Sequence, residues 1–278
     1  MPLSPPDAHY VLELVRSRAA IVIDERKDYL IEQRLAPLAR QVGAASTTEL
    51  IAAVRSGAKP HLRDEVVDAF TTNETSWFRD KFPFEAMRTE LIPALLAARA
   101  PSRTLNVWCG AASTGQEPYS LAILLREHFP QLAGGDVRIV ATDLSRAALA
   151  QAREGRYGQM EINRGLPAAL IPRYFSREGT KFVLRPEVRQ MVEFRELNLA
   201  GPWTGLPRAD LVLLRNVLIY FAAPTKADIL NRIAATVLRS DGYLFLGGAE
   251  TTHTLTDRFE RVQRGSCAWY QLKGGPKS

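Results

Sequence analysis

The chain has 278 residues, 46% of them hydrophobic, and a formal net charge of +6 at pH 7. This size allows one large globular core and one small core. The excess of positive charge suits nucleic acid, an anionic membrane or an acidic protein, and does not choose among them. Two cysteines, Cys109 and Cys267, are too few for a disulfide framework, so we expect a reducing compartment, the cytoplasm.

Targeting, membrane and metal signals are missing from the sequence. No basic segment precedes an apolar run with a cleavage site, and no apolar run approaches the length of a membrane span. The four histidines lack the paired spacing of a helix-borne metal site. We therefore expect a protein that is neither exported nor embedded in a membrane, and no metal site.

The first part of the chain has the periodicity of helices. Apolar residues recur at three- and four-residue intervals over 9–23, 27–43 and 47–57, which predicts a small all-α domain at 1–70. The tract TTNETSWFRDKFPF, at 71–84, breaks this pattern, and an amphipathic helix is expected over 84–99. We interpret 71–100 as a functional linker that carries site residues and a helix.

From residue 101 to 278 short apolar runs alternate with helical segments. Strands are expected in TLNVWC, VRIVATD, DLVLLRNVLIYF, GYLFLGG and CAWYQLK, with helices between them. This order predicts an α/β domain with a doubly wound, mostly parallel sheet. Short alternating pieces such as KFVLR and QMVEFREL, within about 157–197, predict a small antiparallel β insertion.

The turn after TLNVWC is the first place to look for a ligand, because ligands of open parallel sheets lie beyond the carboxyl ends of the strands. The turn reads GAASTGQE, and its small residues let a ligand approach the backbone. Asp143 ends the next strand, where a carboxylate can accept hydrogen bonds from ribose hydroxyls. A tight structural turn and a helix N-cap are the plain alternatives, although Ser145 competes with Asp143 for the cap.

The spacing favours S-adenosylmethionine over NAD as the ligand. An NAD site has its acidic residue about 20 positions beyond a G-x-G-x-x-G series. Here that series is missing, and Asp143 lies far beyond Gly110. S-adenosylmethionine has no phosphate to cradle, and acceptors such as Glu117 and Asn73 suit its sulfonium cation.

Five motifs follow one another along the chain: TTNETSWFRD, NVWCGAASTGQEPYS, ATDLSRAALAQAREGRY, LNL and LLRNVLIYF. In this order they resemble the chemotaxis-receptor methyltransferase family, CheR, over nearly the whole chain. The resemblance implies the S-adenosylmethionine-dependent methyltransferase fold and the methyl esterification of receptor glutamates. One departure is GGAE, ending at Glu250, where the family usually has GHSE.

The resemblance also implies a set of site residues. The implied cofactor contacts are Asn73, Thr75, Arg79, Glu117, Asp143, Asn198, Leu199, Arg215 and Asn216. Arg79 and Tyr220 are the implied catalytic residues, beside the transferring methyl group. Taken alone, each has a structural interpretation: an ion pair for Arg79, a helix cap for Asn73, a packed aromatic for Tyr220.

The expected partner is the cytoplasmic helical domain of chemotaxis receptors. Lys27, Arg34, Arg40, Arg55, Lys59 and Arg63 form a candidate basic docking face on the helical domain. The short stretch SREGTKFVLRPEV predicts that the protein does not depend on the receptor tail peptide. We expect a monomer that binds no nucleic acid. A methyltransferase for another acceptor and a sensor of adenosylmethionine or its product stay open as alternatives.

Overall fold

A computed structural model describes residues 3–23, 28–57, 59–100, 104–134 and 137–275. The chain divides into two compact units. One contains residues 1–72 and 220–225, and the other contains residues 73–219 and 226–278. Each unit has its own buried apolar core.

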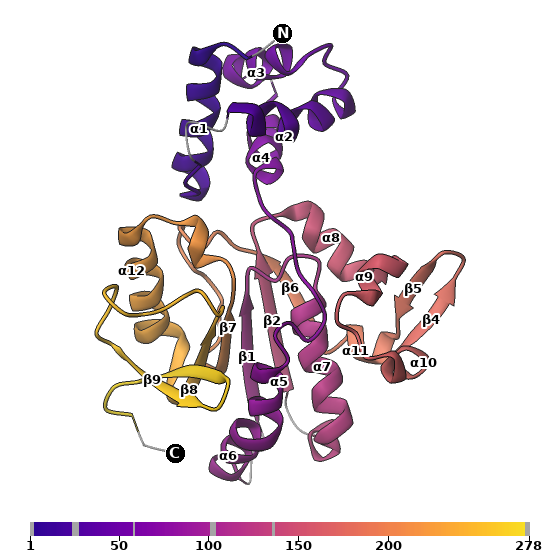
Figure 1. The fold of residues 1–278 in the computed structure, drawn as a ribbon, viewed down its shortest axis with the longest axis vertical. Coiled ribbons are helices and arrows are strands. Elements are labelled where there is room, and N and C mark those ends of the chain that lie inside the picture. The colour runs from indigo at the N-terminus through magenta and orange to yellow at the C-terminus, as the bar shows by residue number, and fades with distance from the viewer. Residues whose placement is uncertain (1–2, 24–27, 58, 101–103, 135–136, 276–278) are drawn as a thin grey trace. The chain divides into compact units, whose positions relative to one another are not determined.

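The helical unit contains the first four helices of the described residues (Figure 1). Its helices are α1 (Pro5–Ala19), α2 (Asp28–Gln41), α3 (Thr47–Ser56) and α4 (His61–Ala69). The side chains of Ser4 and Ser46 accept hydrogen bonds from first-turn N–H groups, which caps α1 and α3. The buried residues of α1 recur at three- and four-residue spacing, as an amphipathic helix requires. The predicted all-α N-terminal region is confirmed.

The second unit is organised around a mostly parallel sheet, also as predicted (Figure 1). Within the described residues its seven strands lie in the order β6-β2-β1-β7-β8-β10-β9. The strands are β1 (Leu105–Gly110), β2 (Val137–Asp143), β6 (Val192–Glu196), β7 (Ala209–Leu214), β8 (Leu238–Leu246), β9 (Phe259–Arg264) and β10 (Cys267–Leu272). The first five pair in parallel, whereas β10 is antiparallel to both neighbours.

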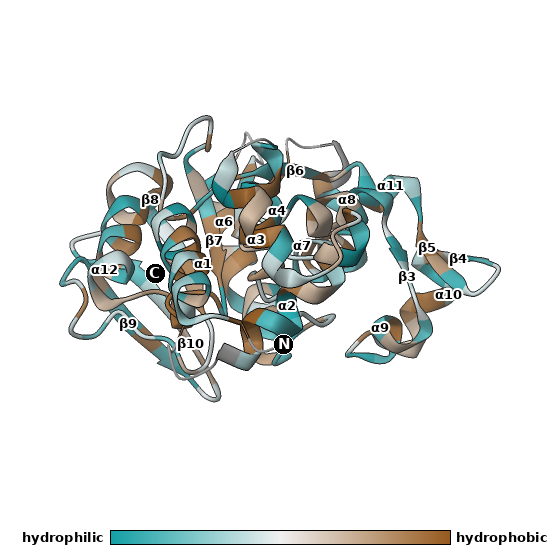
Figure 2. Cartoon of the chain, turned by 90° about the horizontal axis from the view of Figure 1, so that it is seen from above, coloured by the Kyte–Doolittle hydropathy of each residue, from teal (hydrophilic) through white to brown (hydrophobic). Residues whose placement is uncertain are grey.

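The central strands carry apolar residues on both faces, as strands covered on both sides do. All six residues of β7 are buried, and Figure 2 shows the middle of the sheet largely in the brown of hydrophobic residues. Among the helices of this unit are α5 (Phe82–Ala86), α6 (Ile92–Ala98), α7 (Gln116–His128), α8 (Arg146–Glu154) and most of α12 (Ala223–Arg232). Of these, α7 and α8 pack on β2 and β6.

The helix expected over 84–99 is interrupted by a π-helical turn, Met87–Leu91, between α5 and α6. Pro93 lies just after this turn and has no N–H group to donate to the preceding turn. A second π turn, Ile233–Val237, extends α12. Such turns relax the regular hydrogen-bond ladder without ending the helix.

A small antiparallel sheet, β3-β5-β4, follows α8. It contains β3 (Arg156–Tyr157), β5 (Lys181–Leu184) and β4 (Phe175–Glu178), with α9 (Gln159–Asn163), α10 (Ile171–Tyr174) and α11 (Pro186–Arg189) beside them in the chain. The predicted strand in KFVLR is β5. The one in QMVEFREL, however, is β6, which pairs in parallel with β2 at the end of the large sheet. The prediction that this strand belongs to the antiparallel insertion was therefore wrong. Its alternation of buried and exposed residues suits an edge strand of a parallel or an antiparallel sheet, so the pattern alone did not distinguish the two.

One further strand prediction needs correction, and one strand was missed. The strand expected over DLVLLRNVLIYF ends at Leu214, because Asn216 has a φ of 61° and a 3₁₀ turn, Leu218–Tyr220, follows. The edge strand β9 was not predicted, because its sequence, FERVQR, is mostly polar and exposed. Its pairing with β10 comes from the hairpin and not from an apolar pattern.

Replacing Gly165 with Ala is expected to lower the free energy of unfolding by about 2 kcal/mol or more. Gly165 has a φ of 97°, and a Cβ there would lie 2.1 Å from the carbonyl oxygen of Trp77. Gly179→Ala is the matched control: its φ is 59° and no atom lies within 4 Å of the added carbon. Urea unfolding should show the clearly larger loss for Gly165→Ala, and equal losses would contradict this close approach.

Candidate functional site

Strand register brings several of the site residues predicted from the sequence to one edge of the sheet. Gly110, the last residue of β1, pairs with Thr142 of β2 and with Leu214 of β7. Asp143 and Arg215 follow these two residues directly, so they lie at the same level as the start of the glycine loop. Because β1 is also where the strand order reverses, this edge is the switch point at which open α/β sheets bind ligands.

The loop 110–115 between β1 and α7 is held narrow by backbone hydrogen bonds. Ala112 N–H donates to the carbonyl of Thr142 at 2.9 Å, and Gly115, with a φ of 93°, is the N-cap residue of α7. The hydroxyl of Tyr157 donates to the carbonyl of Thr114 at 2.8 Å. Burial raises the pKa of Tyr157, which keeps this donor protonated.

The Asp143 carboxylate is oriented by two backbone donors. Ser113 N–H donates to Oδ2 at 2.7 Å, and Ser145 N–H donates to Oδ1 at 2.8 Å. The Asp143 residue is only 8% exposed. As expected, Ser145 and not Asp143 caps the next helix, with its side chain accepting from Ala148 N–H at 3.1 Å.

The segment 73–81 is fastened to the sheet unit at several points. The carbonyl of Asn73 accepts a 2.9 Å hydrogen bond from the Ser113 hydroxyl, and its side-chain amide donates to Ser145 Oγ at 3.4 Å. Phe78 N–H donates to Ser120 Oγ at 2.9 Å. These bonds place the linker over the glycine loop and the first turns of α7.

Thr75 and Arg79 are half-buried in this segment. The Arg79 side chain donates to the carbonyl of Glu74 at 3.3 Å, and its own carbonyl accepts from Arg215 at 3.0 Å. The sequence left open an ion pair as the structural role of Arg79. The neighbouring carboxylate, Asp80, pairs instead with Arg215 at 2.6 Å.

Glu117 and Arg215 form a buried ion pair between the first turn of α7 and the end of β7. Their side chains are 10% and 1% exposed. Burial opposes the charged form of Arg215, but the carboxylates of Glu117 and Asp80 outweigh it and raise its pKa. Arg215 Nε is buried and has no hydrogen-bond partner among the described residues.

The remaining residues predicted as site residues lie in three places. Asn198 and Leu199 follow β6, the neighbour of β2, and the Leu199 carbonyl accepts from Trp203 Nε1 at 3.1 Å. Asn216 follows Arg215 at the end of β7. Tyr220 ends the 3₁₀ turn and belongs to the helical unit, where its carbonyl accepts from Val22 N–H at 2.9 Å.

Backbone strain concentrates at this edge. Eight described residues other than glycine have a positive φ, and six of them lie in the linker, the glycine loop or the turn after β7. These six are Phe78, Asp80, Lys81, Ala111, Ser113 and Asn216. Strained backbone of this kind persists where the surrounding structure holds it, and it clusters at ligand sites.

Comparison with known proteins identifies the chain. Residues 73–267 match the family model described as the SAM-binding domain of CheR methyltransferase, and residues 6–71 match that of its all-alpha domain. The chain belongs to the CheR methyltransferase family. It is an S-adenosylmethionine-dependent methyltransferase, as the motifs predicted.

Named relatives of this CheR-family chain align over nearly their whole length. Chemotaxis protein methyltransferase Cher2 of Pseudomonas putida is 42% identical, with 91% of this chain and 93% of that protein covered. Chemotaxis protein methyltransferase 1 of Pseudomonas aeruginosa is 43% identical over the same shares. A chemotaxis protein methyltransferase of Vibrio parahaemolyticus is 37% identical over 93% and 94%.

The residues at the sheet edge of this CheR-family chain fit S-adenosylmethionine by their chemistry. Two carboxylates, of Asp143 and Glu117, lie at the ends of β2 and the glycine loop, each residue 8% exposed. Carboxylates accept from the ribose hydroxyls and favour cationic groups such as the ammonium and sulfonium of this cofactor. The orphaned Nε of Arg215 adds a buried donor.

Asp80 and Glu250 were not among the site residues predicted from the sequence. Glu250 accepts from Asn216 N–H at 2.8 Å and from Gly247 N–H at 2.6 Å, and so ties together the ends of β7 and β8. Its other oxygen lies 3.4 Å from Ile219 N. The GGAE motif was the signal available in the sequence, but its partners become visible only in the folded chain.

Glu250→Ala is expected to weaken S-adenosylhomocysteine binding about tenfold, the loss expected for removing a charged hydrogen-bond acceptor. Without the carboxylate, Asn216 loses the bond that holds its positive φ. Glu250→Gln keeps one carbonyl acceptor and should lose less, while Glu260→Ala, an exposed carboxylate on β9, is the control. Calorimetric titration measures all three; wild-type affinity in the Ala variant would refute the role.

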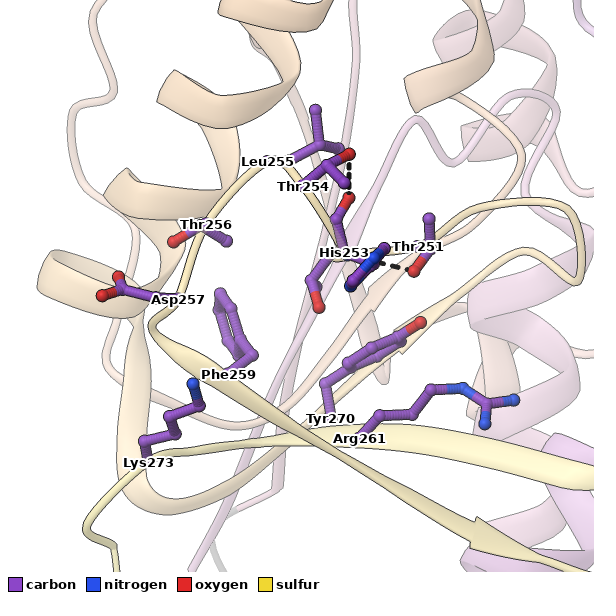
Figure 3. A pocket seen from close by; sticks show the side chains of 11 residues that line it. Thr251, His253, Thr254, Leu255, Thr256, Asp257, Phe259, Arg261, Tyr270 and Lys273 are labelled. Carbon is purple, nitrogen blue, oxygen red and sulfur yellow. Dashed lines mark hydrogen bonds between the residues drawn. The ribbon is translucent and has the colours of Figure 1, made fainter.

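The loop after Glu250 lines a separate pocket of about 690 Å³, with Thr251, His253, Phe259 and Tyr270 among its walls (Figure 3). None of the site residues predicted from the sequence lines it.

Among the described residues there is no group of three or more metal-ligating side chains suited to hold a metal ion. In the same part of the chain, no helix has the length and hydropathy needed to cross a bilayer.

Proposed function

We propose that this protein transfers a methyl group from S-adenosylmethionine to glutamate side chains of chemotaxis receptors, giving glutamate methyl esters. The family membership and the names of the relatives support the reaction and the receptor substrate. The observation that carries it is the meeting of Asp143, Glu117 and Arg215 at the switch point of the sheet, under a linker that carries Arg79.

The proposed cofactor contacts are those that the resemblance implies: Asn73, Thr75, Arg79, Glu117, Asp143, Asn198, Leu199, Arg215 and Asn216. Asn198, Asp143 and Arg215 lie at the carboxyl ends of β6, β2 and β7, and Glu117 follows the loop after β1, which supports this set. The linker residues are tied to the same edge by the hydrogen bonds of Asn73. Asp143 suits the ribose hydroxyls, and Glu117 suits a cationic group. Arg215 neutralises part of the Glu117 charge and keeps the carboxylate in place.

The bound cofactor supplies an electrophilic methyl group on a sulfonium. A glutamate carboxylate is ionised at pH 7, since its ordinary pKa is about 4.3, so attack needs no general base. We assign Arg79 and Tyr220 to orienting that carboxylate, Arg79 by holding one oxygen through a charged hydrogen bond. Catalysis then consists mainly of alignment and the exclusion of water.

The proposed division of the chain is helical domain 1–70, linker 71–100 and methyltransferase domain 101–278, as the sequence suggests. The β insertion predicted at about 157–197 is corrected to the small sheet β3-β5-β4, because β6 belongs to the large sheet. The helical domain would recognise the helical cytoplasmic part of the receptors. We further propose a cytoplasmic monomer that binds no nucleic acid. Sedimentation equilibrium tests the monomer.

Several basic side chains of the proposed docking face form hydrogen bonds or ion pairs within the helical unit, so only part of that face is available to a receptor. Arg34 donates to the carbonyls of Ala69 and Thr71, the latter at 2.6 Å, so it ties α2 to the end of α4. Arg55 is likewise bonded to Pro6 and paired with Asp7, and Arg63 is half-buried. Arg40 and Lys59 are exposed, whereas Lys27 lies outside the described residues.

Reversing the charge of Arg40 and Lys59 together is expected to raise KM for receptor membranes about tenfold at low salt with little change in kcat. Charge reversal at Arg261, an exposed arginine of β9, is the control. The receptor methylation rate as a function of membrane concentration gives both constants. An unchanged KM in the double variant would contradict the proposal that Arg40 and Lys59 contact the receptor.

The β4–β5 hairpin supports the proposed independence of the receptor tail peptide. Glu178 pairs with Lys181, which leaves only Gly179 and Thr180 as the connecting turn. There is little loop here to hold an added peptide. Saturable binding of an isolated tail peptide would contradict this proposal.

The test of the proposed function is the transfer of a radiolabelled methyl group from S-adenosylmethionine to membranes that contain the organism's chemoreceptors. Base treatment should release the label as methanol, the signature of a carboxyl methyl ester. Base-stable label would indicate a methyltransferase for another acceptor. No transfer, despite cofactor binding, would favour the sensor alternative.

A further inference from the structure

A concavity lies at the amino-terminal ends of β7 and β8, opposite the edge of the large sheet that carries the proposed cofactor contacts. It has a volume of about 670 Å³ and is lined by Arg99, Arg208, Arg239 and Arg258, with Asp241 beside them. This volume is typical of small-molecule sites. Leu238, the first residue of β8, also lines it, so it lies at the end of the strands away from the proposed cofactor contacts.

One of the four arginines is fully engaged by carboxylates. Arg99 donates to Asp210 Oδ1 through Nη2 at 2.6 Å and through Nε at 3.0 Å, and to Asp241 Oδ2 through Nη1 at 2.6 Å. Asp210 is fully buried and also accepts from Asn106 N–H at 2.8 Å. The bond from Arg99 lowers the pKa of Asp241, so this carboxylate stays ionised and paired with the arginine.

The other arginines gather around the same strand ends. Arg239 Nε lies 3.4 Å from Asp210 Oδ1, the oxygen that Arg99 already occupies, and forms no hydrogen bond among the described residues. Arg208 Nη1 donates to the carbonyl of Leu238 at 3.0 Å, next to Arg239 in the chain. Ala209 pairs with Leu238, so Arg208 and Arg239 both lie at the amino-terminal ends of β7 and β8.

The charges in this concavity do not balance. Four guanidinium groups and two carboxylates leave a net charge of +2. Guanidinium groups held close together repel one another, and a phosphate group relieves that repulsion through paired N–H donors in the same plane. Arg208 and Arg258 are exposed at the opening and can reach such an anion without unfolding.

We propose that this arginine-lined concavity binds the phosphate group of a phosphorylated small molecule or of a phospholipid headgroup. Arg99 and Arg239 lie beside the Asp210 carboxylate, and the exposed Arg208 and Arg258 provide further donors for the anion. The proposal is independent of the methyl-transfer site, which lies at the other end of the strands.

The test is calorimetric titration of the full chain with inorganic pyrophosphate at low ionic strength. Arg208→Ala and Arg258→Ala should each weaken pyrophosphate binding about tenfold, as expected for losing a charged hydrogen bond. Arg261→Ala removes the same charge from β9 outside the concavity and should leave the affinity within about twofold. Binding of S-adenosylhomocysteine by each variant confirms that it folds.

A second arm distinguishes the two sources of phosphate. The protein is sedimented with phosphatidylcholine vesicles that do or do not contain phosphatidylglycerol. Binding that needs the anionic lipid, depends on Arg208 and Arg258, and is displaced by pyrophosphate supports a headgroup site. Saturable pyrophosphate binding without vesicle binding supports a soluble phosphorylated ligand. No saturable binding in either arm, or an equal loss in Arg261→Ala, overturns the proposal.

Discussion

Replacing Arg79 with Ala is expected to lower kcat by about 10²-fold or more, while affinity for S-adenosylhomocysteine, which Arg79 is also proposed to contact, falls by no more than about tenfold. The side chain is half-buried and donates only to the nearby carbonyl of Glu74 among the described residues. The backbone of the same residue is held by Arg215, so truncating the side chain leaves the linker in place. What is lost is a group proposed to act on the reacting carboxylate.

Single-turnover methylation of receptor membranes measures the chemical step in this variant, and calorimetry measures product affinity. Arg164→Ala is the matched control, because Arg164 pairs with Glu74 at 2.7 Å on the same segment and is largely exposed. Arg79→Lys restores the charge without the planar fork and should recover only part of the rate. Equal turnover in Arg79→Ala and wild type would defeat the assignment.

Arg215→Met is expected to lower the free energy of unfolding by about 3–5 kcal/mol, because it leaves the Glu117 carboxylate buried without its cation. The Glu117 side chain is 10% exposed, so water replaces little of the lost interaction. Combining Arg215→Met with Glu117→Gln removes the uncompensated charge and should restore much of the stability. Urea unfolding of the single and double variants tests this coupling.

Asp80→Asn provides the contrast on the same arginine. The Asp80 side chain is 52% exposed, so solvent screens its 2.6 Å contact with Arg215. The expected loss is below about 1 kcal/mol. If Asp80→Asn and Arg215→Met destabilised the protein equally, burial of the Glu117 pair would not be the cause.

The sequence alone determined the parts of the fold that depend on local pattern. Three- and four-residue apolar spacing predicted the helices of the first unit, such as α1. Short apolar runs predicted β1 and β2, and hence the position of the glycine loop and of Asp143 at strand ends. Those residues are close in sequence to the strands that carry them, so a topological rule places them.

Only the tertiary structure decided which distant groups meet. QMVEFREL has the alternation of an edge strand but joined the large sheet as β6, because pairing with β2 depends on neighbours far along the chain. Asp80 and Arg215 are 135 positions apart, and Glu250 lies 34 positions beyond the Asn216 that it holds. Ion pairs and carboxylate bridges of this kind leave no periodic signal, since their energy depends on burial and distance in the folded chain.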